Sequence, residues 1–311
     1  MSWFSRRRPD DDAPGALPGA FPDDHLAPLS RDDAAWLRTE AVGAFARAGF
    51  TGAVAAADHV RTADGAQYGL ANLARQVAGV DPAHRPAVVD EHARMLRAAQ
   101  DRRARAEASH ETLADVVDLL VARVLLESDL PEVDPAAGPS LGGGLCVRAA
   151  IDYPESVSTL FGAQHGGWEA LGDAALAGLR RLPAPDHELI DHDVHVLVSA
   201  DFFGASRVLL HDELLDGVGA GPRPLGTLVA LPDRAALLVH VLRDATVVHA
   251  LNLMARAARG RQDAPGPLSP HVYYRSPDGA FQQVTQYDGD GVQVHVAGAF
   301  AEAMAAAGLT G

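Results

Sequence analysis

Residues 227–258 read TLVALPDRAALLVHVLRDATVVHALNLMARAA, and the hydrophobic pattern changes its period once within this stretch. Two apolar runs, 227–231 and 236–242, flank the turn-forming sequence Pro-Asp-Arg-Ala at 232–235. Short apolar runs on either side of a turn predict two paired strands. From 247 to 258 the apolar residues recur every three or four positions, which predicts a helix with one buried face. The stretch therefore predicts a strand pair followed by a helix.

Similar patterns continue on both sides of this stretch. The expected strands are 145–151, 156–161, 191–198, 271–275, 281–287 and 292–296, and the expected helices are 168–182, 202–215 and a short Ala-rich segment ending at Ala307. The run 116–126 is apolar and fits either a helix or a strand. Strand pairs separated by helices predict an α+β domain over 111–311, with helices packed on a mixed, largely antiparallel sheet.

The N-terminal part predicts a smaller module over residues 30–110. Its elements are a helix over 31–48, a hairpin within 51–69 and a helix that begins near Pro86. The charged stretch 100–111 is the expected boundary between this helix-hairpin-helix module and the larger domain.

The composition of the chain excludes several classes of function but does not identify one. The chain has 311 residues, and its net charge of -15 argues against general binding to nucleic acid or to anionic membranes. No uncharged run reaches the ~18 apolar residues of a membrane span. The single cysteine, Cys146, cannot form an internal disulfide. We expect a cytoplasmic protein whose Pro- and Asp-rich residues 1–29 form a flexible tail.

All 26 cationic side chains are arginine, and the sequence contains no lysine. Phosphate-loop nucleoside triphosphatases, protein kinases, pyridoxal phosphate enzymes and Ser/Lys acylating enzymes each need a specific lysine. The sequence therefore excludes these four classes.

A polar cluster surrounds the expected strand 191–198. Residues two apart on a strand point to the same side, so Asp191, Asp193 and His195 would share one face. Two carboxylates and an imidazole can hold a divalent metal, and Glu188 could serve as a base. A further ligand could come from any of His211, Asp212 and His240. The alternative is a half-exposed strand whose outer face is simply polar.

A second candidate site is the corner at which this strand leads into the helix at 202–215. Asp201 can cap that helix through a backbone N–H, and Arg207 lies within reach of a carboxylate. The same corner, with Ser206, could instead hold an anionic ligand between the helix N-terminus and Arg207.

Four segments resemble the YtpQ-like family of bacterial proteins. They are the helix 168–183 ending in Leu-Arg-Arg-Leu-Pro, the segment 201–209 with Asp201, Ser206 and Arg207, the two strands within 228–243, and 268–281. The resemblance implies an intracellular α+β protein and brings no established reaction, cofactor or catalytic residue.

No complete catalytic arrangement is visible in the sequence. We therefore expect a non-enzymatic binding or interaction module that recognises a protein partner or a small ligand through its C-terminal sheet and needs no cofactor. The alternative is a metal-dependent hydrolase with its divalent metal at Asp191, Asp193 and His195.

Overall fold

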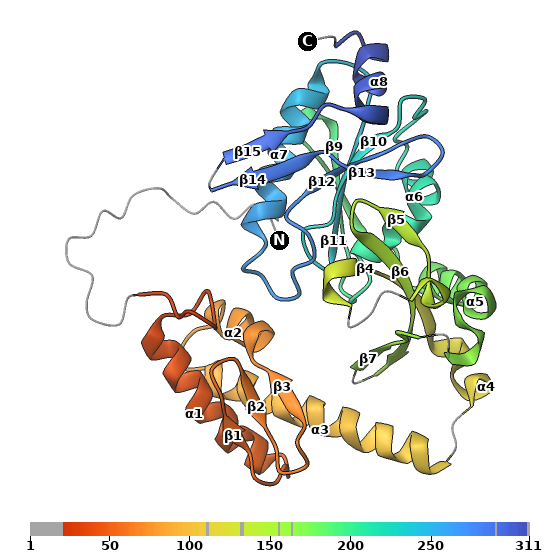
Figure 1. Ribbon diagram of the computed structural model, residues 1–311. Helices are drawn as coiled ribbons and strands as arrows, with labels where there is room; N and C mark the ends of the chain where they lie inside the picture. Colours follow the sequence, from red (N-terminus) through yellow and green to blue (C-terminus); the bar gives the residue numbers. More distant parts are fainter. Residues whose placement is uncertain are drawn as a thin grey trace. The chain divides into compact units, whose positions relative to one another are not determined.

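The computed structural model describes residues 21–109, 112–130, 134–154, 156–162, 164–289 and 291–309. The chain forms two units that meet between Arg97 and Ala98 (Figure 1). This division falls inside a long helix, before the charged stretch at which the sequence suggested a boundary.

Six strands of the C-terminal unit form an antiparallel sheet in the order β13-β12-β10-β11-β9-β8. Their bounds are β8 Asp186–Ile190, β9 Val194–Val198, β10 Thr227–Ala230, β11 Ala236–Val241, β12 Val272–Arg275 and β13 Phe281–Gln283. Strands β10 and β11 are buried along their whole length, as expected for central strands with apolar side chains on both faces.

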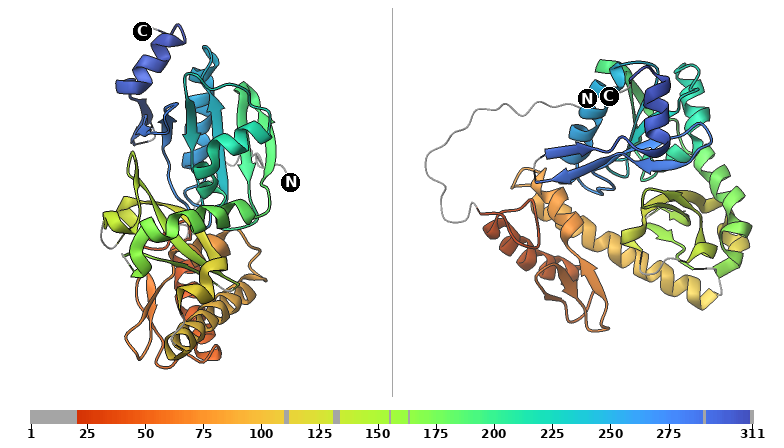
Figure 2. Two further views of the ribbon diagram at one scale, coloured as in Figure 1. Left: turned by 90° about the vertical axis from the view of Figure 1, so that its right-hand side faces the viewer. Right: turned by 45° about the horizontal axis from the view of Figure 1, so that its top comes forward.

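Helices cover both faces of this sheet. The 3-10 helix η6 (Ala205–Leu210) and helix α6 (His211–Gly217) pack on one face, where Leu215 joins a buried cluster with Leu237 and Val239. Helix α7 (Thr246–Gly260) contacts β10, β11 and β12. In the left view of Figure 2, α6 lies in front of the strands and α7 behind them.

A second antiparallel sheet contains β4 (Leu120–Leu126), β5 (Ser140–Gly142), β6 (Leu145–Tyr153) and β7 (Ser156–Thr159). The ambiguous run 116–126 is thus mostly strand, preceded by helix α4 (Leu113–Val116) and the 3-10 turn η1 (Val117–Leu119). Helix α5 (Gly167–Arg181) packs on β4. Any side chain at Gly178 would clash there, because an added Cβ would lie 1.7 Å from the Leu120 carbonyl oxygen.

The C-terminal end forms a separate hairpin and a helix. Strand β14 (Thr285–Asp288) pairs with β15 (Gly291–Val294), and helix α8 (Gly298–Ala306) follows. Four 3-10 turns complete the unit: η2 (Glu127–Asp129), η3 (Pro135–Ala137), η4 (Gln164–Gly166) and η5 (Asp191–Asp193).

The N-terminal unit begins with helix α1 (Arg31–Arg47), which Ser30 caps by accepting a hydrogen bond from the Asp33 amide. Three short strands follow, β1 (Val54–Ala55), β2 (His59–Arg61) and β3 (Gln67–Gly69), and they pair in sequence order. The region predicted as a two-stranded hairpin therefore has a third strand.

Helix α2 (Ala71–Ala78), which the sequence did not predict, belongs to the N-terminal unit, and helix α3 (Arg85–Ser109) begins in this unit and continues past Arg97 into the next. The latter corresponds to the helix expected from Pro86.

The flexible tail predicted for residues 1–29 extends too far. Residues 1–20 lie outside the described residues, but Leu26 and Leu29 are buried in the N-terminal core. Asp23 accepts hydrogen bonds from the backbone of Leu26 and from Arg38. Apolar burial and this ion pair order a segment that its proline content alone would leave flexible.

The structure confirms the α+β class, and every strand pairing within the described residues is antiparallel. None of the helices in this part of the chain is long and apolar enough to cross a membrane.

Candidate ligand-binding corner at the end of strand β9

A buried arginine fixes the corner that follows β9. The Arg207 guanidinium forms a bidentate ion pair with Asp201, with Nη1 2.9 Å from Oδ1 and Nη2 2.8 Å from Oδ2. It also donates to Ser199 Oγ (2.7 Å) and to the Pro183 carbonyl (2.6 Å). Asp201 Oδ1 accepts the Phe203 amide at 2.8 Å, so this carboxylate caps the following turn. The predicted ion pair is therefore present, but the predicted helix cap is not, because helix η6 begins at Ala205 after Gly204 and Asp201 caps the turn before it.

Ser206 fixes the same corner to the second sheet. Its Oγ accepts a hydrogen bond of 3.0 Å from the Val124 amide on β4, and both groups are buried. The neighbouring Ala205 amide donates to the Arg234 carbonyl at 3.1 Å. Of the three predicted ligand-binding residues, Asp201 and Arg207 bind each other, while Ser206 binds the backbone of β4.

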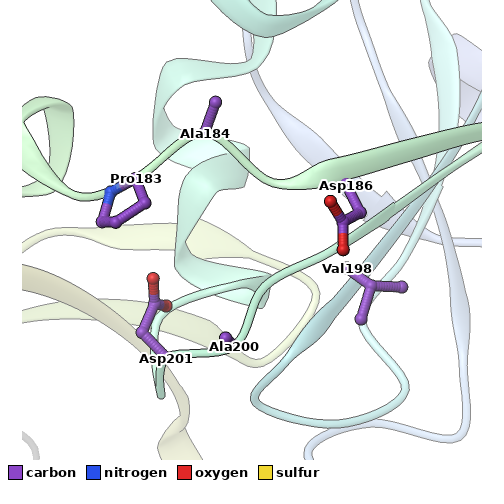
Figure 3. A pocket seen from close by; sticks show the side chains of 6 residues that line it. All are labelled: Pro183, Ala184, Asp186, Val198, Ala200 and Asp201. Atoms are coloured by element: carbon purple, nitrogen blue, oxygen red, sulfur yellow. The ribbon is translucent and has the colours of Figure 1, made fainter.

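An open cavity of about 340 Å³ lies beside this corner. Its lining residues come from the segment before β8, from β8 and from the end of β9: Pro183, Ala184, Asp186, Val198, Ala200 and Asp201. Figure 3 shows Asp186 and Asp201 on opposite sides of the space. Arg207 neutralises Asp201, whereas Asp186 is exposed and has no ion-pair partner among the described residues.

A third carboxyl group lies near this corner. Burial, and then the charge of Asp201, raise the pKa of Asp152 on β6. The corner therefore combines small apolar side chains with an excess of negative charge.

The predicted metal-binding face is not formed. Asp191 and Asp193 lie in the turn η5 between β8 and β9, and only His195 lies on a strand. His192 and Asp193 have positive φ angles of 62° and 55°, which reverse the chain direction and end the alternation on which the prediction depended. Within the described residues, no three His, Cys, Asp or Glu side chains are grouped as metal ligands.

His195 instead forms a pair with His187 on β8. His195 Nδ1 lies 3.0 Å from His187 Nε2, and the two rings are stacked. Burial, and then the charge of His187, lower the pKa of His195 to about 4. His195 is therefore neutral near neutral pH, and a neutral imidazole can share one hydrogen bond in this way.

The further ligands considered in the sequence analysis have other partners. His240 Nδ1 lies 3.3 Å from the Asp193 carbonyl oxygen, which helps to hold the turn. His211 lies between Asp212 Oδ1 (3.0 Å) and Thr227 Oγ1 (2.9 Å), and burial lowers its pKa to about 4.

The carboxylate, imidazole and hydroxyl of this second group have the order of a catalytic triad, which the sequence analysis missed because Thr227 is distant in the chain. Thr227 is completely buried, so its hydroxyl cannot reach a substrate in this structure. The group therefore stabilises the contact between α6 and β10.

Comparison of the chain with protein-family models, with curated proteins and with solved structures gave no match.

Proposed function

We propose that the C-terminal unit is a non-enzymatic interaction module that recognises a protein segment carrying a basic side chain. The observation that supports this proposal is the open cavity between Pro183 and Asp201, whose wall is fixed by the ion pair of Arg207. A wall that is ordered before binding loses little conformational entropy when a partner arrives.

The chemistry of the lining favours a long cationic side chain. Pro183 and Val198 offer apolar surface for an aliphatic stem, while Asp186, which has no ion pair with any described residue, offers a carboxylate to the charged end. The net charge of -15 would also attract a basic partner over a distance.

The test is a titration of the full chain with the peptide acetyl-Ala-Arg-Ala-amide, followed through the methyl signals of Ala184 and Ala200 by nuclear magnetic resonance. We expect saturable shifts of both signals and a weaker response to the same peptide with norleucine in place of arginine. The variant Asp186→Asn should weaken binding of the arginine peptide, and Ala200→Trp should abolish it by filling the cavity.

Two exposed positions outside the cavity provide matched controls. Asp173→Asn on α5 and Ala305→Trp on α8 make the same chemical changes at exposed sites and should leave binding unchanged. Absence of any shift, or equal responses to the two peptides, would contradict the proposal.

The other expectations from the sequence remain predictions. A metal-dependent hydrolase would need Asp191, Asp193 and His195 to converge, and the turn η5 gives this alternative no support. Membership of the YtpQ-like family and a cytoplasmic location are likewise untested.

A further inference from the structure

Two partly buried arginines of the C-terminal unit form no ion pair with a carboxylate in the part of the chain that the structure describes. Arg123 on β4 donates one hydrogen bond, from Nη1 to Thr159 Oγ1 at 2.9 Å. Arg234, in the turn between β10 and β11, lies over the ring of Phe202, with its guanidinium carbon 4.0 Å from the ring centroid. Among the described residues, no Asp or Glu forms an ion pair with either guanidinium, although Arg207 and several others are paired.

The nearest carboxylate in the sequence is already occupied. Asp233 is buried and pairs with Arg261, whose Nη2 lies 2.6 Å from its Oδ2. It also accepts the Ala235 amide through Oδ1. Asp233 adds a favourable charge near Arg234 but forms no hydrogen bond with that side chain.

The fold attaches the backbone at Arg234 and the backbone next to Arg123 to neighbouring residues of η6. Two consecutive residues of η6 hold them: Ala205 binds the Arg234 carbonyl, and Ser206 binds the amide of Val124, the residue next to Arg123. Burial, and then the charge of Arg234, lower the pKa of Arg123, so the two guanidinium groups repel each other. Two partly buried cations that repel each other and form no ion pair with a carboxylate carry a free-energy cost that a bound anion can reduce.

We propose that Arg123 and Arg234, together with Thr159 and Phe202, form a binding site for a doubly charged oxyanion such as a phosphate monoester. Two guanidinium groups match the charge of such a dianion and can each donate two parallel hydrogen bonds to its oxygens. Thr159 supplies a hydroxyl group, and the ring of Phe202 restrains the Arg234 guanidinium.

This site goes beyond the proposed function. None of the residues that line the cavity of Figure 3 belongs to it, and the ligand has the opposite charge. Failure of the peptide titration therefore leaves the oxyanion site intact, and failure of the oxyanion site leaves the peptide result unchanged.

The test is isothermal titration calorimetry of the full chain with inorganic phosphate at low ionic strength, with sulfate and acetate as comparison anions. We expect phosphate and sulfate to bind more tightly than the singly charged acetate. Arg123→Gln and Arg234→Gln should each weaken phosphate binding about tenfold or more, because each removes charge-assisted hydrogen bonds. Arg234→Lys, which keeps the charge and loses the planar fork, should give an intermediate affinity.

Arg256→Gln provides the control, because Arg256 is an exposed arginine on α7 and should not affect phosphate binding. In the wild-type chain, the side-chain N–H resonances of Arg123 and Arg234 should shift on addition of phosphate, which tests the site without any substitution. The proposal would be overturned if the wild-type chain binds neither phosphate nor sulfate. It would also be overturned if all the variants bind phosphate equally, or if other arginine resonances shift instead.

Discussion

Arg207 lies in the short helix η6, and the carbonyl of Arg234 accepts a hydrogen bond from the first residue of that helix, yet the two guanidinium groups have opposite surroundings. Arg207 is 2% exposed and donates four hydrogen bonds, two of them to the carboxylate of Asp201. Arg234 lies over an aromatic ring and forms no ion pair with a carboxylate of the described residues, and its charge adds to burial in lowering the pKa of Arg123. The first guanidinium completes the fold, and the second is left available for a ligand.

This difference distinguishes a cation that stabilises the fold through an ion pair from a cation that is free to bind a ligand. Removal of one partner from a buried ion pair leaves the other charge without compensation. Removal of a charge that has no partner relieves desolvation and repulsion instead. The two kinds of arginine should therefore respond to substitution with opposite signs in the free energy of unfolding.

The largest effect is expected for Arg207→Met. The substitution leaves Asp201 partly buried without its cation and releases Ser199 and the Pro183 carbonyl, so the free energy of unfolding should fall by about 3 to 5 kcal/mol. Urea denaturation followed by circular dichroism measures this change. The double variant Arg207→Met, Asp201→Asn should recover part of the loss, whereas an undiminished loss would show that the ion pair is not its cause.

Two buried histidines, His195 and His211, are uncharged near neutral pH, and acidification should therefore lower the free energy of unfolding. Both His195 and His211 have pKa values lowered to about 4, mainly by burial, against 6.5 for the unperturbed side chain. The folded protein binds a proton at these histidines more weakly than the unfolded chain does. Their contribution to the free energy of unfolding is therefore fully present above pH 6.5. It is lost as the pH falls towards 4.

Each histidine should contribute on the order of 2 kcal/mol to this pH dependence. Urea denaturation at several pH values should show the decline, and His211→Gln, which preserves a polar group near Thr227, should reduce its slope. An unchanged slope in this variant would remove His211 from the explanation.

A smaller effect is expected at an uncharged contact of the same corner. Ser206→Ala leaves the buried amide of Val124 without its acceptor, which should lower the free energy of unfolding by about 1 to 2 kcal/mol. Ser158→Ala on β7 is a suitable control, because Ser158 is exposed and its side chain has no hydrogen bond to any residue that the structure describes. Equal losses in the two variants would show that Ser206 has no special role.

The helices and strands with a clear period were predictable from the sequence, and the turns between them were less so. Strand pair β10-β11 and helix α7 follow directly from their apolar patterns. The β8-β9 turn was missed because Asp191, His192 and Asp193 contain no glycine or Asn-Gly signal, although Asp and His do tolerate positive φ angles. That one turn removed the predicted metal-binding face.

The sequence also predicted local contacts better than distant ones. The pairing of Asp201 with Arg207 was predictable because the two residues lie six positions apart at a helix start. The approach of Arg123 to Arg234 depends on how η6 contacts both β4 and β11, and no local pattern encodes that contact. Candidate sites that depend on tertiary packing therefore need the structure.

The smallest expected effect has the opposite sign from that of Arg207. Arg123→Met replaces a partly buried, unpaired cation by an apolar side chain of similar length, and loses only the hydrogen bond to Thr159. We expect the free energy of unfolding to rise by about 0.5 kcal/mol in phosphate-free buffer. Phosphate should stabilise the wild-type chain and not the variant, since a ligand stabilises only the folded state that binds it. A clear loss of stability in phosphate-free buffer would instead make Arg123 a structural residue like Arg207, and the contrast between the paired and the unpaired arginines would no longer hold.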